Sequence, residues 1–388
     1  MSVITQVSAV AFRASYRELV AAVKAAGIVE SRRGTDRVFF DVTDDSVVVA
    51  AATPSRVLNV QLPAEAPAVG RLVLGHNAFS KALAAAGKGC RKADLDHLQV
   101  AISSDADAGT AQLAVDGYTI PLAVLSHDSF PDQIIPPASR VRVQRDAFAA
   151  MFGRVHAAAS NDALVEVLTH VQATFDYERL ELLATDRYRA SHAFLPVAVP
   201  ESFVGRQALL PAVAAKLLPF LDGEEIAIGL TDDAITIASG TVTMQMPTNH
   251  EDSYPKLGHL FPETDQVQAT LDRAQFHRAA VRAAALTAAA GEKLSPVHLL
   301  IDTGSVTVVP TSFDGPGAGP ALEADVTGAT DPTDPCSIGL NRDYLVDAIA
   351  QFPQDDVTIH ITAPNKPVML TAKTGTFRHI IMPTRLLN

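Results

Sequence analysis

Tryptophan is absent from the 388-residue sequence, and aromatic residues make up only 6% of it. Stacking of bases on aromatic side chains is therefore a poor candidate for a binding mode. Basic residues are outnumbered, because 31 Lys and Arg face 43 Asp and Glu and give a net charge of −12. This balance argues against a simple basic nucleic-acid-binding module, but it allows positive charge to gather on one surface.

Cysteine occurs only as Cys90 and Cys336, far apart in sequence and at no metal-binding spacing. We interpret both as buried or free thiols in a reducing cytosol. No apolar run reaches the roughly 18 residues that a membrane span needs, and residues 1–12 lack the basic start and apolar core of a signal peptide. With 48% hydrophobic residues, the sequence predicts a globular, cytoplasmic protein of about two to four domains.

Near the end of each third of the sequence, an aromatic or apolar residue is followed by proline, at Phe130-Pro131, Tyr254-Pro255 and Met382-Pro383. The prolines are 124 and 128 residues apart. This spacing is too long for a solenoid repeat and predicts one domain used three times. Boundaries fall near residues 134–140 and 258–266, which gives domains 1–137, 138–264 and 265–388.

Each third ends in three short alternating or apolar runs, which predict an antiparallel meander. The runs are 98–102, 111–115 and 118–124; 226–230, 234–238 and 242–246; and 357–361, 368–371 and 377–381. A short helix precedes each meander (77–86, 211–221, 341–352), and a longer alanine-rich helix opens each third (16–26, 146–159, 272–290). The predicted fold class is α+β, with helices on antiparallel sheets. Residues 311–320, rich in Gly and Pro, predict a surface loop.

Motifs for catalysis or cofactor binding are missing. Gly87-Lys88 lacks the glycine five residues earlier that a phosphate loop needs, because Ala82 stands there. No HExxH motif occurs, and the histidines are scattered. Ser191-His192 is an adjacent pair, and adjacency does not supply the convergence that a catalytic triad needs. We expect no catalytic site, no metal and no cofactor.

Residues 182–190 read LLATDRYRA, and residues 380–388 read IIMPTRLLN. Both segments, together with the threefold layout, resemble the bacterial sliding clamp, the beta subunit of DNA polymerase III. In that family an Ala-Thr-Asp-x-x-Arg segment lies in the second domain and a Met-Pro-x-Arg-Leu segment ends the third. The resemblance implies a non-enzymatic processivity factor of DNA replication. Such a clamp is a head-to-tail homodimeric ring that encircles duplex DNA and tethers polymerases, the clamp loader and repair factors.

The resemblance also implies a cleft between the second and third domains that binds short motifs rich in Gln, Leu and Phe. Apolar side chains and tyrosine can form such a groove, and arginine and threonine can orient a peptide in it. The residues carried over are Leu168 on an upstream strand, Thr185, Arg187, Tyr188, Arg189, Ala190, Pro255, His259, Leu260, Asn341, Tyr344, Pro367, Ile380, Met382, Pro383, Thr384, Arg385 and Leu386. As an alternative, Leu168, Ile380 and Met382 are ordinary core residues of strands.

At the dimer seam, the resemblance places residues of the first domain against the first helix of the third. The seam residues are Ile120 and Leu122 on one side and Ala285 and Leu286, beside Arg282, on the other. Clamps usually carry bulkier residues than Ile120 and Ala285, so this seam buries less apolar area and is predicted to be weaker. His259 stands where Arg is common and Thr384 where a larger apolar residue is common. These departures indicate a divergent clamp, or a second copy with altered partner choice.

A clamp needs topological retention more than tight contact, so a weakly positive lumen suits it. The helix predicted at 272–290 fits, because from Arg273 onward it contains no acidic residue. The predicted DNA-facing residues are Arg17, Lys24, Lys81, Lys88, Arg91, Lys92, Arg145, Arg154, Lys216, Arg273, Arg278 and Arg282. For each residue alone, a solvated helix face is the alternative. Asp146 and Asp272, near helix starts, are better explained as capping or dipole-matched residues.

Two rival hypotheses stay open. A paralogue that keeps the fold and the cleft but not the ring would act as a peptide-binding scaffold or decoy, and it would be a monomer in solution. An enzyme on a repeated α+β scaffold would need a polar pocket with perturbed acids, for which the sequence carries no motif.

Overall fold

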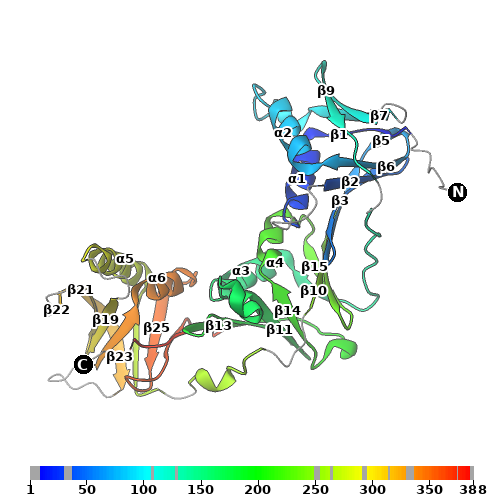
Figure 1. Ribbon diagram of the computed structural model, residues 1–388. Helices are drawn as coiled ribbons and strands as arrows, with labels where there is room; N and C mark the ends of the chain where they lie inside the picture. The colour runs from blue at the N-terminus through cyan, green and yellow to red at the C-terminus, as the bar shows by residue number, and fades with distance from the viewer. Residues whose placement is uncertain are drawn as a thin grey trace. The chain divides into compact units, whose positions relative to one another are not determined.

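The computed structural model describes residues 9–29, 37–105, 109–126, 130–248, 254–262, 265–290, 295–312, 315–328, 336–373 and 375–384. The chain divides into two compact units, and Figure 1 labels their helices and strands. Unit one comprises Met1–Ala149, Pro200–Phe203 and Val213–Asn249, and unit two comprises Ala150–Val199, Val204–Ala212 and His250–Asn388. The division into three domains stays a prediction, because each unit combines parts of more than one of them.

Along the described residues, one order of elements recurs three times: a strand, a helix, several strands, a second helix no longer than the first, and three strands. The first repeat contains β1 (Ala11–Ser15), α1 (Tyr16–Ala26), β2 (Arg37–Val42), β3 (Ser46–Thr53), β4 (Arg56–Pro63), β5 (Glu65–Ala68), β6 (Gly70–Gly75), α2 (His76–Ala86), the 3-10 turn η1 (Asp94–Asp96), β7 (Gln99–Asp105), β8 (Thr110–Val115) and β9 (Tyr118–Ala123). The second contains β10 (Val141–Gln144), α3 (Arg145–His156), η2 (Ala163–Thr169), β11 (His170–Asp176), β12 (Arg179–Thr185), β13 (Arg189–Pro196), η3 (Glu201–Phe203), β14 (Gln207–Pro211), α4 (Val213–Leu217), η4 (Leu218–Phe220), β15 (Glu225–Leu230), β16 (Ala234–Ser239) and β17 (Val242–Pro247). The third, after η6 (Gly258–Leu260), contains β18 (Val267–Asp272), α5 (Arg273–Ala289), β19 (Pro296–Asp302), β20 (Ser305–Val309), β21 (Thr311–Ser312), β22 (Gly315–Pro316), β23 (Ala321–Gly328), β24 (Cys336–Asn341), α6 (Arg342–Ala350), β25 (Asp356–Ile361), β26 (Val368–Thr371) and β27 (Phe377–Ile381).

The three predicted meanders are confirmed as β7–β8–β9, β15–β16–β17 and β25–β26–β27. Each is extended at its first strand by the strand that opens its repeat, because β1 pairs with β7, β10 with β15 and β18 with β25. The sequence prediction missed these opening strands. They are short, and their partners lie more than 80 residues later in the chain, beyond the reach of local patterns.

Unit one holds a five-stranded sheet, β5-β1-β7-β8-β9, and an eight-stranded sheet, β10-β15-β16-β17-β4-β3-β2-β6. Unit two holds a twelve-stranded sheet, β14-β11-β12-β13-β27-β26-β25-β18-β23-β20-β19-β24. Two antiparallel ladders join strands of different repeats, β4 with β17 in unit one and β13 with β27 in unit two. The second of these ladders builds the candidate site.

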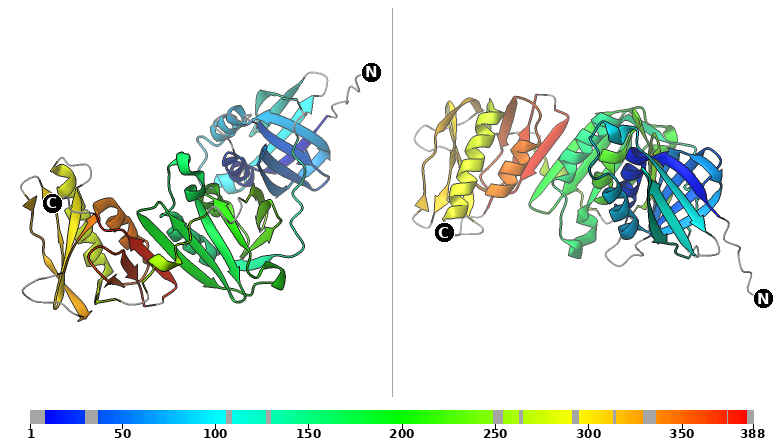
Figure 2. Two further views of the ribbon diagram at one scale, coloured as in Figure 1. Left: turned by 60° about the horizontal axis from the view of Figure 1, so that its bottom comes forward. Right: turned by 90° about the horizontal axis from the view of Figure 1, so that it is seen from above.

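The long helices bury one face each. In α5, Phe276, Ala280, Ala283 and Thr287 are buried and recur at three- and four-residue spacing, as in an amphipathic helix. Asp272 caps α5, because its carboxylate accepts a hydrogen bond from the Gln275 amide at 2.6 Å, which confirms the predicted cap. In unit two, α5 and α6 lie side by side (Figure 2).

Two local predictions were wrong. Residues 211–221 form α4 followed by the 3-10 turn η4 and not one helix, because Pro219 lacks the amide hydrogen that an α-helix would use. The segment 311–320 is not only loop, since β21 and β22 pair within it. No helix among the described residues has the length and hydropathy that crossing a membrane requires.

Candidate functional site

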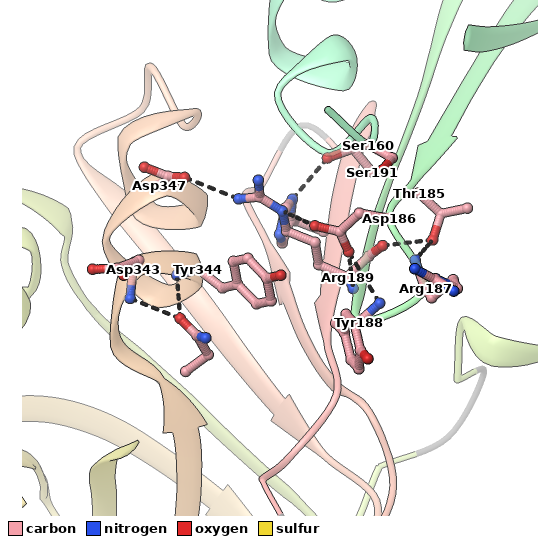
Figure 3. Close-up of polar contacts among 12 residues, drawn as sticks. Ser160, Thr185, Asp186, Arg187, Tyr188, Arg189, Ser191, Asp343, Tyr344 and Asp347 are labelled. Carbon is pink, nitrogen blue, oxygen red and sulfur yellow. Dashed lines mark hydrogen bonds and ion pairs between the residues drawn. The ribbon is translucent and has the colours of Figure 1, made fainter. Parts of the chain in front are cut away.

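The segment that joins β12 to β13 is a tight turn held by its own side chains (Figure 3). The Thr185 hydroxyl donates to the Arg189 carbonyl at 2.7 Å and accepts from the Arg187 amide at 3.1 Å. The Asp186 carboxylate accepts from the amides of Tyr188 and Arg189, each at 3.0 Å. Arg187 has a φ of 83°, a left-handed conformation that costs roughly 1–2 kcal/mol for a residue with a Cβ. The side-chain hydrogen bonds offset this cost, so the turn has its shape before any ligand binds.

Arg189 connects this turn to α6. Its Nε donates to the Asp186 carboxylate and its Nη1 donates to Asp347 on α6, both at 3.0 Å. The guanidinium carbon lies 4.4 Å from the centroid of the Tyr344 ring (Figure 3). Burial and the nearby Asp186 raise the pKa of the Tyr344 hydroxyl. Because the Arg189 side chain is only 9% exposed, its pairing with Asp186 is shielded from water and fixes the turn against the helix.

A row of small and apolar side chains lies beside the turn. The strand register places Thr185 opposite Ala190 and Ala190 opposite Ile380. Side chains alternate between the faces of a sheet, so these three share one face, and Met382 follows two residues after Ile380. The Met382 amide donates to the Tyr188 carbonyl at 2.8 Å, which ties the chain beyond β27 to the turn.

Residues from the segment 255–260 complete an apolar pocket on this face. Its cavity volume is about 220 Å³, and its lining includes Pro255, Leu257 and Leu260 together with the row just described. Behind the lining, Phe261 and Met369 are buried in one cluster with Ala190 and Ile380. An apolar cavity next to a fixed turn can accept apolar side chains of a peptide.

Eight predicted cleft residues line this pocket: Thr185, Arg187, Arg189, Ala190, Pro255, Leu260, Ile380 and Met382. The alternative for Ile380 does not exclude this role, because the side chain is 2% exposed and still faces the cavity. The placement of Leu168 on a strand was wrong. Leu168 is buried near the end of η2, where its carbonyl accepts from the Ser160 amide at 2.8 Å.

The other predicted cleft residues do not line this pocket. Asn341 caps α6, because its side chain accepts from the amides of Asp343 and Tyr344 at 2.9 and 3.1 Å. Tyr188 is 58% exposed on the turn, and His259 is exposed on η6. The positions of the rest are as follows: Pro367 is buried ahead of β26, Pro383 and Thr384 follow β27, and Arg385 and Leu386 lie outside the described residues. Asn341 thus has a structural role at the start of α6.

Three residues of the site were missed by sequence reasoning. Leu257 lines the pocket, and Asp186 and Asp347 fix Arg189. Asp186 belongs to the segment that carried the resemblance, so it could have been included. Asp347 stands 158 residues from Arg189, and no sequence spacing links the two.

Ser191 has a buried histidine partner, but this partner is not the adjacent His192. The Ser191 hydroxyl lies 2.7 Å from Nδ1 of His379 on the paired strand β27. Both residues are at most 1% exposed, and burial lowers the pKa of His379 to about 3. The pair lies on the opposite face of the strands from the pocket, where no substrate reaches it. It is therefore a core contact and not a nucleophile with its base.

The predicted DNA-facing residues lie on or next to helices of the two units. Seven of them are exposed and form no ion pair with another residue in the described part of the chain: Lys24, Lys81, Lys88, Lys92, Lys216, Arg278 and Arg282. Others are engaged: Arg17 pairs with Asp96, Arg91 with Asp94, Arg145 with Asp146, and Arg273 donates to the Gln354 carbonyl. Burial lowers the pKa of Arg154. The exposed set is the better candidate for binding phosphates, because a paired guanidinium contributes less net charge.

The predicted seam residues occupy two kinds of exposed position. Ile120 and Leu122 lie on β9, an edge strand of the five-stranded sheet in unit one. Ala285 and Leu286 lie on the exposed face of α5 in unit two, where Leu286 is 60% exposed. A groove of about 240 Å³ runs between this helix face and residues such as Val308 and Leu322.

Residues 258–385 match the family described as DNA polymerase III beta subunit, C-terminal domain. A beta sliding clamp from Streptomyces coelicolor is 26% identical over 309 residues, which cover 75% of this chain and 78% of that protein. One from Micrococcus luteus is 28% identical over 215 residues, covering 54% of this chain and 67% of that protein. A crystal structure of a sliding clamp from Pseudomonas aeruginosa, bound to griselimycin, matches with a TM-score of 0.84 at 18% identity, over 97% of this chain and 100% of that one. The chain therefore has the DNA clamp fold, and its residues 258–385 match the C-terminal domain of the DNA polymerase III beta subunit.

Proposed function

We propose that this protein is a sliding clamp that encircles duplex DNA as a homodimer and tethers DNA polymerases, the clamp loader and repair factors to it. It acts in the cytoplasm, has no catalytic site of its own and is built from the domains 1–137, 138–264 and 265–388. The observation that carries the proposal is the apolar pocket beside the Thr185–Arg189 turn. The match of residues 258–385 to the DNA polymerase III beta subunit and the similarity to beta sliding clamps support the proposal.

The pocket suits a short linear motif rich in Gln, Leu and Phe. Its apolar lining, from Ile380 and Met382 to Leu260, would bury apolar side chains, with a gain of about 25 cal/mol per Å² of apolar area. Exposed groups on the turn, such as Tyr188, can contact the peptide backbone at the rim. Because the turn is already shaped, binding requires little ordering of the protein.

A ring is supported by two exposed features of the chain. The edge strand β9 presents Ile120 and Leu122. The helix α5 presents Leu286, which is 60% exposed and lines the groove of about 240 Å³, and elsewhere on its surface Val281, which is 42% exposed. An open strand edge and an apolar helix face on one chain can complement each other in a head-to-tail dimer, where both become covered.

The ring is tested by molar mass from light scattering after gel filtration across a dilution series. We expect a mass twice the 41.0 kDa of the chain, persisting at low concentration. A monomer at every concentration would sink the ring and favour the scaffold or decoy hypothesis. Retention on a closed DNA circle with release after linearisation then tests encirclement.

The cleft is tested by fluorescence polarisation with a labelled peptide rich in Gln, Leu and Phe. Deleting residues 382–388 should abolish binding without unfolding the protein, because Met382 lines the pocket. Griselimycin, which is bound in the Pseudomonas aeruginosa structure, should displace the peptide from the full chain. Binding retained by the folded truncation, or no displacement, counts against the cleft.

A further inference from the structure

A second, larger pocket lies next to the apolar one in unit two. Its cavity volume is about 540 Å³, and its charged and titratable lining consists of Arg179, Glu181, His192, Tyr254, Lys256 and Arg378. None of these residues belongs to the segments that carried the family resemblance. The pocket therefore needs its own explanation.

The two pockets are neighbours on one face of the sheet. The register places Leu183 opposite His192 and His192 opposite Arg378. The row Leu183, His192 and Arg378 runs parallel to the row Thr185, Ala190 and Ile380, which lines the apolar pocket. The two rows are two residues apart along each strand, a distance of about 7 Å. Pro255 and Leu257 line both pockets. A ligand that fills the apolar pocket can thus continue into the polar one without leaving the surface.

A chain of contacts orders the polar pocket. Arg378 Nη2 donates to His192 Nδ1 at 3.0 Å, and Nε2 of His192 lies 3.4 Å from the Glu181 carboxylate. Because a guanidinium can only donate, His192 accepts at Nδ1, which leaves Nε2 to donate to Glu181. Arg179 Nε pairs with the other carboxylate oxygen of Glu181 at 2.7 Å. The one acid of the pocket is therefore occupied on both oxygens.

The remaining charge of the pocket is positive. Three cations, Arg179, Lys256 and Arg378, stand against the carboxylate of Glu181 in the lining and that of Asp176, which lies 3.4 Å from Arg179 Nε. The hydrogen bond from His192, helped by the charges of Arg179 and Arg378, lowers the pKa of Glu181 and keeps it ionised. Arg378 also stacks on Phe261, with its guanidinium carbon 5.3 Å from the ring centroid, which fixes its direction. In a chain of net charge −12, this is a local excess of oriented donors.

We propose that the polar pocket binds an acidic side chain, Asp or Glu, of the same partner peptide whose apolar residues fill the neighbouring pocket. This inference rests on the proposed function of the apolar pocket and adds a specificity element to it. A carboxylate complements the cationic excess and can take two donors of a guanidinium at once. A basic peptide residue would find the Glu181 carboxylate already paired with Arg179 and His192. An apolar residue would remove water from the guanidinium groups without replacing its hydrogen bonds, which costs free energy. The spacing of the rows places the acid about two to four residues from the apolar anchor in an extended peptide.

The test uses the full chain and labelled peptides that share one Gln-, Leu- and Phe-rich core. One pair carries three Glu or three Gln after the core, and another pair carries them before it. We expect one of the two Glu peptides to bind about 5- to 10-fold more tightly than its Gln partner at low salt, with the advantage shrinking as salt rises. The position that shows the gain reveals the direction of the peptide.

The matched variants are Arg179→Gln with Lys256→Gln, and the control Arg142→Gln with Lys373→Gln. The side chains of Arg179, Arg142 and Lys373 are at least half exposed, and Lys256 is also exposed. Both double variants remove two positive charges. The first variant should abolish the advantage of the Glu peptide and leave the Gln peptide unchanged, while the control keeps it. If the core peptide binds and neither Glu extension helps, the polar pocket does not select acids. If no peptide binds at all, the proposed cleft itself fails.

Discussion

The β3–β4 hairpin of unit one and the β12–β13 hairpin of unit two share one backbone plan. Each closes with a two-residue loop, since Thr53 pairs with Arg56 and the Asp186 amide donates to the Arg189 carbonyl. The second strand of each hairpin pairs with the last strand of a meander, β4 with β17 and β13 with β27. Aligned in this way, Arg56 corresponds to Arg189.

The residues on the outer face of these ladders differ. Where unit two pairs Ala190 with Ile380, unit one pairs Val57 with Gln245. Gln245 thus puts an amide at the place where the apolar pocket has its isoleucine. The two ladders have the same backbone pairing, and the side chains at this pair differ in polarity.

The arginines and the inward pairs differ too. Arg189 has the carboxylates of Asp186 and Asp347, whereas Arg56 faces Thr53, and its Nε is buried without a hydrogen-bond partner in the described part of the chain. On the buried face of the same ladders, Ser191 pairs with His379 in unit two, and Leu58 pairs with Met244 at the corresponding place in unit one. Unit two, which contains the apolar pocket, therefore has polar contacts that connect its turn to α6 and β13 to β27.

The largest effect is expected from Arg189→Ala. This change leaves Asp186 partly buried without its cation and releases the turn from α6, so we expect a loss of about 3 kcal/mol in unfolding free energy. Urea denaturation measures the loss, and polarisation measures the accompanying loss of peptide binding. Arg142→Ala, in an exposed pair with Glu225 in unit one, should cost less than about 0.5 kcal/mol. Equal losses in the two variants would show that the contacts of Arg189 contribute no more than an exposed ion pair.

The next effect concerns Ile380→Gln, which copies Gln245 into the pocket. Burying an amide at a site that is 2% exposed should cost about 2 kcal/mol of stability. The loss of apolar lining should weaken peptide binding by roughly 10- to 100-fold. The reverse change, Gln245→Ile, should create no peptide binding in unit one, because Arg56 lacks the carboxylates that shape the turn. Unchanged affinity of the Ile380→Gln variant would show that the peptide binds elsewhere.

A pH dependence follows from His379. Its pKa is lowered to about 3 in the folded chain, against about 6.5 in the unfolded chain. The folded state holds the ring neutral, so its contribution is complete above about pH 6.5 and is lost as pH falls toward 3, by about 1.4 kcal/mol per pH unit. Ser191→Ala with His379→Met, which brings in the residue of Met244, should reduce the slope between pH 6 and pH 4.5 by about that amount. Parallel stability curves for the two proteins would contradict this assignment.

The smallest effect is expected from Arg56→Met. The buried Nε of Arg56 has no acceptor among the described residues, so its loss removes no hydrogen bond at that atom. Thermal and urea unfolding should shift by less than about 0.5 kcal/mol, in either direction. A loss as large as that of Arg189→Ala would mean that the two arginines play the same part.

Local patterns predicted the helices and meanders well, and β26, β27 and α1 have the predicted bounds. They could not predict the opening strands, whose partners are distant, or the break at Pro219. The pocket residues followed from a resemblance in two segments, and the structure brings eight of them together. The polar pocket was not predicted from the sequence, because Glu181, His192 and Arg378 come together only through the pairing of their strands. Ser191 and His379, 188 residues apart, likewise share no sequence signal.

The ladder between β13 and β27 has a consequence for folding. It joins Arg189 to Ile381, so the pocket is absent from every partly folded chain in which β27 has not docked. Closing such a long loop is among the slower steps that a topology can impose. During synthesis the pocket can appear only after Met382 has been added and has left the ribosome. The proposed peptide binding would thus report the final docking step, because only chains that have completed unit two contain the pocket.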